Sequence, residues 1–285
     1  MVKSKINKAD AVKKKKVKAK TKKIGSLAKR ILTAIVMLPI AIGSLWGGYP
    51  FVDVLALIVG TLLAWEWANM IPNRSVSTYM GAYVMALAVS LFVYDTPMVV
   101  STVVLVSFFV WFKAKGEEYR NLLVLGVPYI SVGVGSLLWI YQGIIPYPPF
   151  NFYITLWFFL MVWAMDIGGF IVGCNLKGPK LAPKISPNKT WSGLIGGIIL
   201  AMAVSYLYIY LVVKDDQSMH MFFVVLGGII AAISQIGDLI ESAIKRKLGI
   251  KDSSSLIPGH GGVFDRIDGL IFAAPFFYWL FAYGL

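Results

Sequence analysis

Long apolar runs separated by short polar connections make up most of the chain after residue 30. A transmembrane helix needs about 20 predominantly apolar residues. Nine segments approach this length: 31–47, 51–70, 77–94, 97–112, 122–141, 151–173, 193–213, 219–240 and 267–285. The runs are continuously apolar instead of alternating, which favours helices over the strands of a membrane barrel. The pattern therefore predicts an all-α polytopic integral membrane protein with about nine transmembrane helices.

The connections between these segments divide the chain into three regions. Residues 1–30 form a polar tail, residues 31–150 hold about five helices, and residues 151–285 hold about four helices with two long polar loops. If the tail lies in the cytoplasm, 13 of the 14 basic residues outside it fall in cytoplasmic connections. This positive-inside distribution predicts a cytoplasmic N-terminus and a C-terminus on the opposite side. We also expect the protein to lie in a bacterial-type inner membrane, with its active site on the cytoplasmic side.

Composition supports a lipid environment and confines the excess charge to the tail. The chain is 58% hydrophobic and only 14% charged, whereas a soluble domain carries about 25% charged residues. Of the formal net charge of +13, the tail contributes 13 Lys or Arg against one acid. Such a segment is predicted to be disordered and to contact anionic lipid headgroups. It has no interleaved aromatic residues, so we do not expect it to bind nucleic acid. The single cysteine, Cys174, allows no intrachain disulfide.

Asp166 stands inside the sixth predicted membrane helix. A charged side chain at the centre of a bilayer costs roughly 2.5–3.5 kcal/mol. We therefore expect Asp166 to face a polar interior, either within a functional site or in an ion pair between helices.

The connection 177–191 contains four lysines, three prolines and no acid. The prolines predict an extended, ordered loop. Lys189 and the hydroxyls of Ser186 and Thr190 suit a phosphate or pyrophosphate group. A loop that is basic only because it faces the cytoplasm is the alternative.

Two pairs of carboxylates mark the ends of the last two predicted helices. Asp238 and Glu241 are three residues apart, as are Asp265 and Asp268, so each pair shares one helix face. Together they would place four carboxylates at the cytoplasmic surface, where a hard cation such as Mg²⁺ would relieve their repulsion. For single residues, simpler alternatives are a helix N-cap at Asp265 and an intrahelical pair of Glu241 with Lys245.

A glycine-rich turn, Pro258-Gly259-His260-Gly261-Gly262, separates the two pairs. Glycines allow backbone N–H groups to turn toward an anion, so the turn is predicted to bind substrate. His260 is a candidate to hydrogen-bond phosphate or to act as an acid.

Several of these motifs resemble those of the CDP-diacylglycerol synthase (phosphatidate cytidylyltransferase) family. The run 237–268 resembles the defining motif of that family, and residues 181–191 resemble its second motif. The Asp166 segment resembles its intramembrane aspartate motif, and Trp65-Glu66-Trp67 is a weaker match. The chain departs from the family pattern at Cys174, Gly178 and Ser192.

The resemblance implies that CTP and phosphatidic acid react to give CDP-diacylglycerol and pyrophosphate. It also implies Mg²⁺ dependence, with K⁺ as a candidate second cation, and a homodimer. Interpreted together with the charge pattern, it assigns metal ligands at Asp238, Glu241, Asp265 and Asp268. Candidate substrate-binding residues are Ser186, Lys189, Thr190, Gly259, Gly261 and Gly262. Candidate catalytic residues are Asp166, Lys189, Lys245, Arg246, Lys251, Asp252, His260 and Arg266.

Two other functions fit some of the same residues. A CTP-dependent lipid kinase, or a cytidylyltransferase for another lipid, would use similar polar loops. An ion-coupled transporter would line its path with Glu66, Asp166 and Asp238. The concentration of charged groups on one predicted face favours an enzyme at the membrane surface over a transporter.

Overall fold

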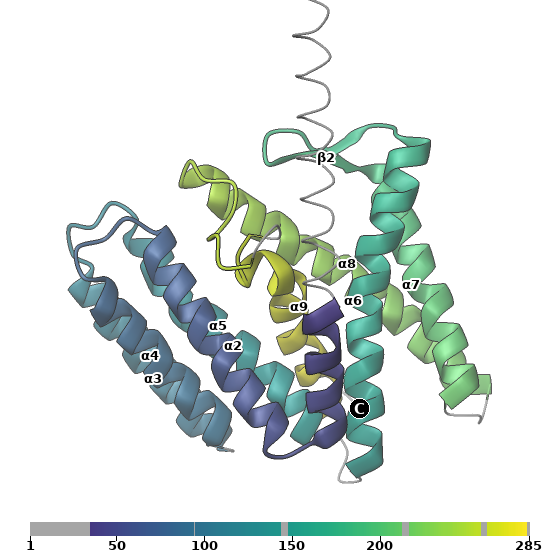
Figure 1. Ribbon diagram of the computed structural model, residues 1–285, viewed down its shortest axis with the longest axis horizontal. Coiled ribbons are helices and arrows are strands. Elements are labelled where there is room, and N and C mark those ends of the chain that lie inside the picture. Colours follow the sequence, from purple (N-terminus) through teal and green to yellow (C-terminus); the bar gives the residue numbers. More distant parts are fainter. Residues whose placement is uncertain (1–34, 94, 144–147, 213–216, 258–260, 284–285) are drawn as a thin grey trace, which may run out of the picture.

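The computed structural model describes residues 35–93, 95–143, 148–212, 217–257 and 261–283, so the predicted tail, Gly259 and His260 lie outside the described residues. Within these ranges the chain forms helices and one short hairpin (Figure 1). The helices are Ile35–Gly47, α2 Phe51–Met70, α3 Val76–Phe92, α4 Thr96–Lys113, α5 Arg120–Gly143, α6 Pro148–Leu176, α7 Trp191–Val212, α8 Gln217–Lys247 and α9 Phe264–Tyr283.

The described helices confirm a helical, polytopic membrane protein. Six of them are long and apolar enough to cross a membrane, namely α2, α4, α5, α6, α7 and α8. The helices Ile35–Gly47 and α3 are apolar but shorter. Helix α9 begins with three charged residues in its first five positions, which lowers its mean hydropathy. The total of nine crossings and their orientation stay predictions.

Helix α8 extends well past the predicted membrane segment 219–240. It contains 31 residues, which at 1.5 Å per residue makes a helix about 46 Å long, against a hydrocarbon core of about 30 Å. Its last two turns therefore carry Glu241, Lys245 and Arg246 beyond the apolar run.

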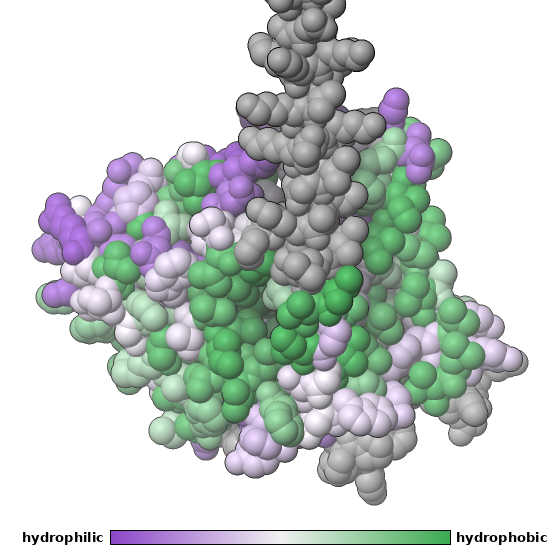
Figure 2. Space-filling view, in the orientation of Figure 1, coloured by the Kyte–Doolittle hydropathy of each residue, from purple (hydrophilic) through white to green (hydrophobic). Residues whose placement is uncertain are grey.

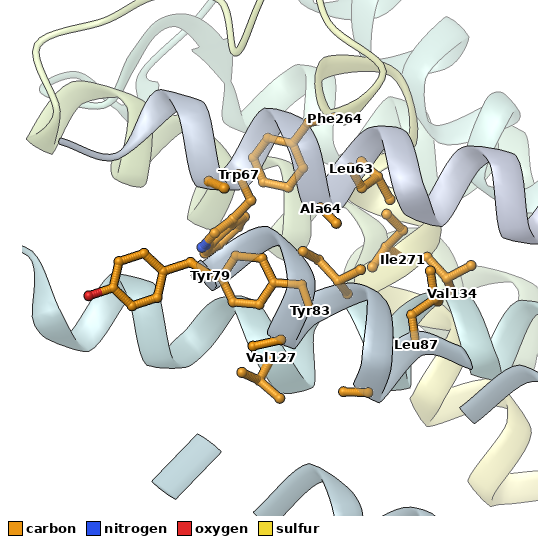
Figure 3. Packing of buried hydrophobic residues seen from close by; sticks show 14 of the residues in the cluster. Leu63, Ala64, Trp67, Tyr79, Tyr83, Leu87, Val127, Val134, Phe264 and Ile271 are labelled. Carbon is orange, nitrogen blue, oxygen red and sulfur yellow. The ribbon is translucent and has the colours of Figure 1, made fainter. Parts of the chain in front are cut away.

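Two apolar clusters hold the helices together. One packs α2, α3, α5 and α9, and includes Leu63, Tyr83, Val134 and Ile271 (Figure 3). The other packs α6, α7, α8 and α9 and includes Phe277. Helices α5 and α9 contribute to both clusters and contact each other. The N-terminal and C-terminal helices are thus joined through α5 and α9.

Large apolar side chains cover the flanks of the molecule. Phe108, Phe112, Phe170 and Trp279 are each 64–72% exposed. Figure 2 shows apolar surface along the helices and polar residues gathered toward one end. Hydrophobic exposure of this extent is expected where side chains face lipid.

The connections after α2, α4, α6 and α8 lie at the same end of the helices (Figure 1). The Arg74 amide after α2 donates to the Glu117 carboxylate after α4 at 3.0 Å. Arg246 at the end of α8 donates from Nε to the Ile185 carbonyl in the loop after α6 at 3.2 Å. We refer to this end as the polar end.

The proline-rich loop at the polar end is extended, as predicted, and it forms an antiparallel hairpin. Strands β1 Lys180–Ala182 and β2 Ser186–Thr190 pair in a register that places Lys180 opposite Thr190. The hairpin leaves α6 and leads directly into α7, so it holds Lys189 close to both helices.

Helices α6 and α7 approach so closely that their contact requires glycine. A methyl group at Gly197 would lie 2.6 Å from the Met165 sulfur and 2.7 Å from its carbonyl oxygen. We expect Gly197→Ala to lower the free energy of unfolding by about 1–3 kcal/mol, because backbone must move to admit the methyl group.

Denaturation of the purified protein in detergent micelles measures this loss. Gly81→Ala is the matched control, because a methyl group at Gly81 in α3 would meet nothing within 4 Å. Alanine there should be neutral or stabilising. Equal stability of the two variants would contradict the close α6–α7 contact.

Candidate active site

Three carboxylates from two helices meet at the polar end. Oxygen atoms of Asp238 and Glu241 on α8 and of Asp268 on α9 all lie within 4.8 Å of one another. The spacing of three places the first two on one face of α8, and α9 brings the third against that face. We call Asp238, Glu241 and Asp268 the carboxylate group. Asp265 is not part of it.

The chemistry of the carboxylate group fits a hard divalent cation. Mg²⁺ prefers carboxylate oxygens, often completed by substrate phosphates. The Tyr129 hydroxyl of α5 is buried, has no hydrogen-bond partner among the described residues, and interacts electrostatically with all three carboxylates. A buried hydroxyl without a hydrogen-bond partner is uncommon. A bound ligand, or one of the carboxylates in another orientation, would provide the missing partner.

Asp166 of α6 and Lys189 of β2 complete the charged neighbourhood. Asp166 interacts electrostatically with Asp238, Lys189 and Arg266. Lys189 forms an ion pair with Asp238 across 49 residues of sequence. Asp166 is exposed, although the sequence predicted that it would face a polar interior, and it lies within electrostatic reach of Asp238 and Lys189. The hairpin brings a cation directly to the carboxylate group.

Lys245 links the two predicted carboxylate pairs. Its Nζ lies 2.6 Å from Glu241 and 2.7 Å from Asp265, and all three side chains are nearly buried. Asp265 also accepts hydrogen bonds from the Gly262 amide at 2.8 Å and from the Ser253 amide at 3.0 Å. Its oxygens are thus occupied by protein donors, which makes it an anchor for the loop before α9.

The protonation of Asp265 follows from these contacts, at the start of α9 ahead of its apolar run. Burial opposes the charged form, but interactions with Glu241 and Lys245 and the hydrogen bond from the Gly262 amide outweigh burial and lower the pKa of Asp265 below its ordinary value. Asp265 is therefore an ionised acceptor at neutral pH.

Other predicted site residues have roles within the fold. The buried Thr190 accepts a hydrogen bond at Oγ1 from the Gly193 amide at 3.1 Å, which caps the start of α7. Arg246 ties the end of α8 to the hairpin through the Ile185 carbonyl. Ser186, at the start of β2, is half-buried.

The remaining predicted residues lie around this core. Lys251, Asp252 and Arg266 are exposed at the polar end. The Gly261 amide donates to the Ile257 carbonyl at 3.2 Å, and the Gly262 amide donates to Asp265. Both amides therefore have partners within the protein, which neither the glycine spacing nor the resemblance indicated.

Glu66 of α2 was not among the predicted site residues, yet it contacts the loop that leads into α9. Its carboxylate is 1% exposed and accepts hydrogen bonds from the Val263 and Phe264 amides, both at 2.8 Å. The sequence feature that could have identified Glu66 is an acidic residue between two tryptophans in the last turns of an apolar helix. Its partners lie almost 200 residues away, so sequence spacing gave no indication of them.

These features define a membrane-embedded helical protein with a cation-suited carboxylate group beside a lysine-bearing hairpin. Comparison with known proteins is more specific. The pattern of the cytidylyltransferase family matches residues 28–283, and the chain belongs to that family.

Several curated relatives are named phosphatidate cytidylyltransferase. The chain is 35% identical to the enzyme of Brucella suis over 90% of this chain and 93% of the relative. It is 32% identical to that of Haemophilus influenzae over 91% and 100%, and 34% identical to that of Pseudomonas aeruginosa over 88% and 95%. The relatives match nearly the full chain, so the similarity covers the N-terminal helices as well as the site.

Proposed function

We propose that this protein transfers the cytidylyl group of CTP to phosphatidic acid, releasing pyrophosphate and forming CDP-diacylglycerol. Family membership and the relatives' names support a cytidylyltransferase with this lipid substrate. The observation that carries the proposal is the carboxylate group paired with Lys189 at the polar end. This arrangement suits two phosphate-bearing substrates and a divalent cation.

In the proposed reaction, a phosphate oxygen of phosphatidic acid attacks the α-phosphorus of CTP. A new P–O bond forms there, and the bond from the α-phosphorus to the bridging oxygen of pyrophosphate breaks. The lipid phosphate is already ionised near neutral pH, so the site needs no strong base. Positioning and electrostatic stabilisation supply most of the acceleration in phosphoryl transfer.

The residues around the site have distinct proposed roles. Asp238, Glu241 and Asp268 would hold Mg²⁺, which when bound would neutralise phosphate charge. Lys189 changes partners from Asp238 to a substrate phosphate. Asp166 orients the group from within the membrane. We assign further phosphate contacts to Lys251 and Arg266, which are exposed at the same end.

The arrangement in the membrane is part of the same proposal. Nine crossings would place the polar end in the cytoplasm of a bacterial inner membrane, with the C-terminus outside. Nucleotide would reach the site from water, and the lipid would arrive laterally from the bilayer. A homodimer, implied by the family resemblance, is also proposed.

Purified protein in mixed micelles tests this function. We expect pyrophosphate release from CTP only when phosphatidic acid and Mg²⁺ are both present, with CDP-diacylglycerol formed in equal amount. A CTP-dependent lipid kinase would release CDP instead of pyrophosphate, which separates the two enzymes in one assay. Turnover with another lipid phosphate but none with phosphatidic acid would reject the proposed substrate, and no turnover of CTP would reject the activity.

A further inference from the structure

The Glu66 carboxylate connects the N-terminal helices to the chain around the site. Its Oε1 accepts from the Ser254 hydroxyl at 2.6 Å and from the Val263 amide at 2.8 Å. Its Oε2 accepts from the Ser253 hydroxyl at 3.1 Å and from the Phe264 amide at 2.8 Å. Each oxygen therefore receives one backbone N–H and one hydroxyl. All four donors lie 187–198 residues from Glu66 in sequence.

These contacts provide a cap for α9 from another helix. The first N–H groups of a helix have no intrahelical partner, and the helix dipole favours negative charge at that end. Helix α9 starts at Phe264. A buried carboxylate that binds the Val263 and Phe264 amides therefore fixes where α9 begins and how it is oriented.

The same contacts locate the acids of the site. Asp265 follows Phe264 directly, and Asp268 lies one turn further along α9. Two residues beside Glu66 also donate to Asp265: Ser253 through its amide and Gly262 through its amide. Glu66 and Asp265 thus hold the two ends of one loop, and Asp265 connects through Lys245 to Glu241.

Packing leaves Glu66 little freedom to move. The Trp67 ring packs against the Phe264 ring (Figure 3) at a centroid distance of 5.3 Å. The centroid of the Tyr129 ring lies 5.2 Å from that of Trp67. A methyl group at Gly262 would lie 2.5 and 2.7 Å from the Glu66 oxygens. The loop approaches Glu66 this closely only because residue 262 has no side chain.

We propose that Glu66 is a positioning residue for the active site, holding the start of α9 so that Asp268 meets Asp238 and Glu241. This inference rests on the proposed function for its effect on turnover. The hydrogen-bond partners of Glu66 lie in the loop and at the start of α9, so it acts on the carboxylate group through these segments. The N-terminal helices would then contribute directly to the geometry of the site.

Glu66→Gln is the informative substitution because it keeps the size of the side chain. Each carboxylate oxygen receives a backbone amide, so either orientation of the glutamine sets an NH₂ group against the Val263 or the Phe264 N–H. We expect backbone amides of residues 261–268 to exchange hydrogen at least about tenfold faster, with no change in α3. We also expect kcat to fall about 10–100-fold and the Mg²⁺ concentration for half-maximal rate to rise, as for other residues that orient metal ligands.

Asp53→Asn is the matched control. Asp53 lies near the other end of α2, is 6% exposed, and accepts a hydrogen bond from Gln142 at 2.7 Å. It should leave exchange at 261–268 and the Mg²⁺ dependence unchanged. If Asp53→Asn also accelerated exchange at 261–268, replacement of any buried acid in α2 would have this effect, and the proposal would be overturned.

Two further results would also overturn it. One is wild-type exchange at 261–268 in Glu66→Gln, and the other is faster exchange with unchanged turnover and Mg²⁺ dependence. If Glu66→Gln does not fold, the double variant Ser253→Ala/Ser254→Ala removes two of the four donors and should give a smaller change of the same kind. Wild-type behaviour of that double variant would then reject the positioning role. A wild-type protein without CTP turnover would reject the proposed function, while the exchange comparison would still decide whether Glu66 holds α9.

Discussion

Asp238→Asn is expected to lower the rate of Mg²⁺-dependent pyrophosphate release by about 10³-fold while leaving the protein folded. Asp238 belongs to the carboxylate group and pairs with Lys189. A bound metal ion supplies several kcal/mol of charge stabilisation to the transition state, and loss of about 4 kcal/mol corresponds to about 10³-fold in rate. The Asp238 side chain is 30% exposed, so the amide can be accommodated without disturbing the core.

Steady-state rates at increasing Mg²⁺ concentrations measure the effect, and thermal unfolding in detergent reports the fold. Glu118→Gln is a suitable control, because Glu118 is an exposed acid at the polar end after α4. It should retain wild-type rates. An Asp238→Asn enzyme that keeps its Mg²⁺ dependence and turns over within about tenfold of wild type would mean that Asp238 does not hold the metal.

Lys245→Met is expected to lower the free energy of unfolding by about 3–5 kcal/mol, the usual effect of removing one partner from a buried ion pair. Lys245 contacts both Glu241 and Asp265, whose side chains are only 2% and 4% exposed. Methionine keeps most of the side-chain volume, so the loss would come from charge. The ionised Asp265 would then be buried without a cation beside it.

Denaturant titration in micelles measures this loss, with Lys247→Met as the control. Lys247 lies two residues further along the same helix and is exposed, so its replacement should change stability by less than about 0.5 kcal/mol. Equal effects of the two substitutions would contradict a buried role for Lys245.

Asp265→Asn is expected to disturb more of the structure than Asp238→Asn does. Asp265 interacts with Lys245 and accepts from the Gly262 and Ser253 amides. Its loss would disturb the loop before α9 as well as the site. From sequence alone the two aspartates are expected to have the same role, because each belongs to a pair of carboxylates spaced by three residues. Only the geometry of the loop shows that Asp265 anchors the loop, whereas Asp238 belongs to the carboxylate group.

The helices could be predicted closely because their signal is local. Apolar runs in a membrane must be helical, since lipid offers no partner for backbone groups. The predicted segment 51–70 and α2 have the same bounds. The extension of α8 to Lys247 was harder to predict, because polar residues continue the helix beyond the apolar run. Helical phase also predicted that Asp238 and Glu241 share a face.

The sequence by itself determined a helical membrane protein, its family, and the acidic and basic residues that carry the proposed chemistry. All of these depend on local composition, on spacing within one helix, or on matching motifs. Only the tertiary structure decided that oxygen atoms of Asp268 lie within 4.8 Å of those of Asp238 and Glu241, that Lys245 bridges the two pairs, and that Glu66 caps α9. These relations depend on how helices distant in sequence pack against one another, and that packing is a property of the whole bundle.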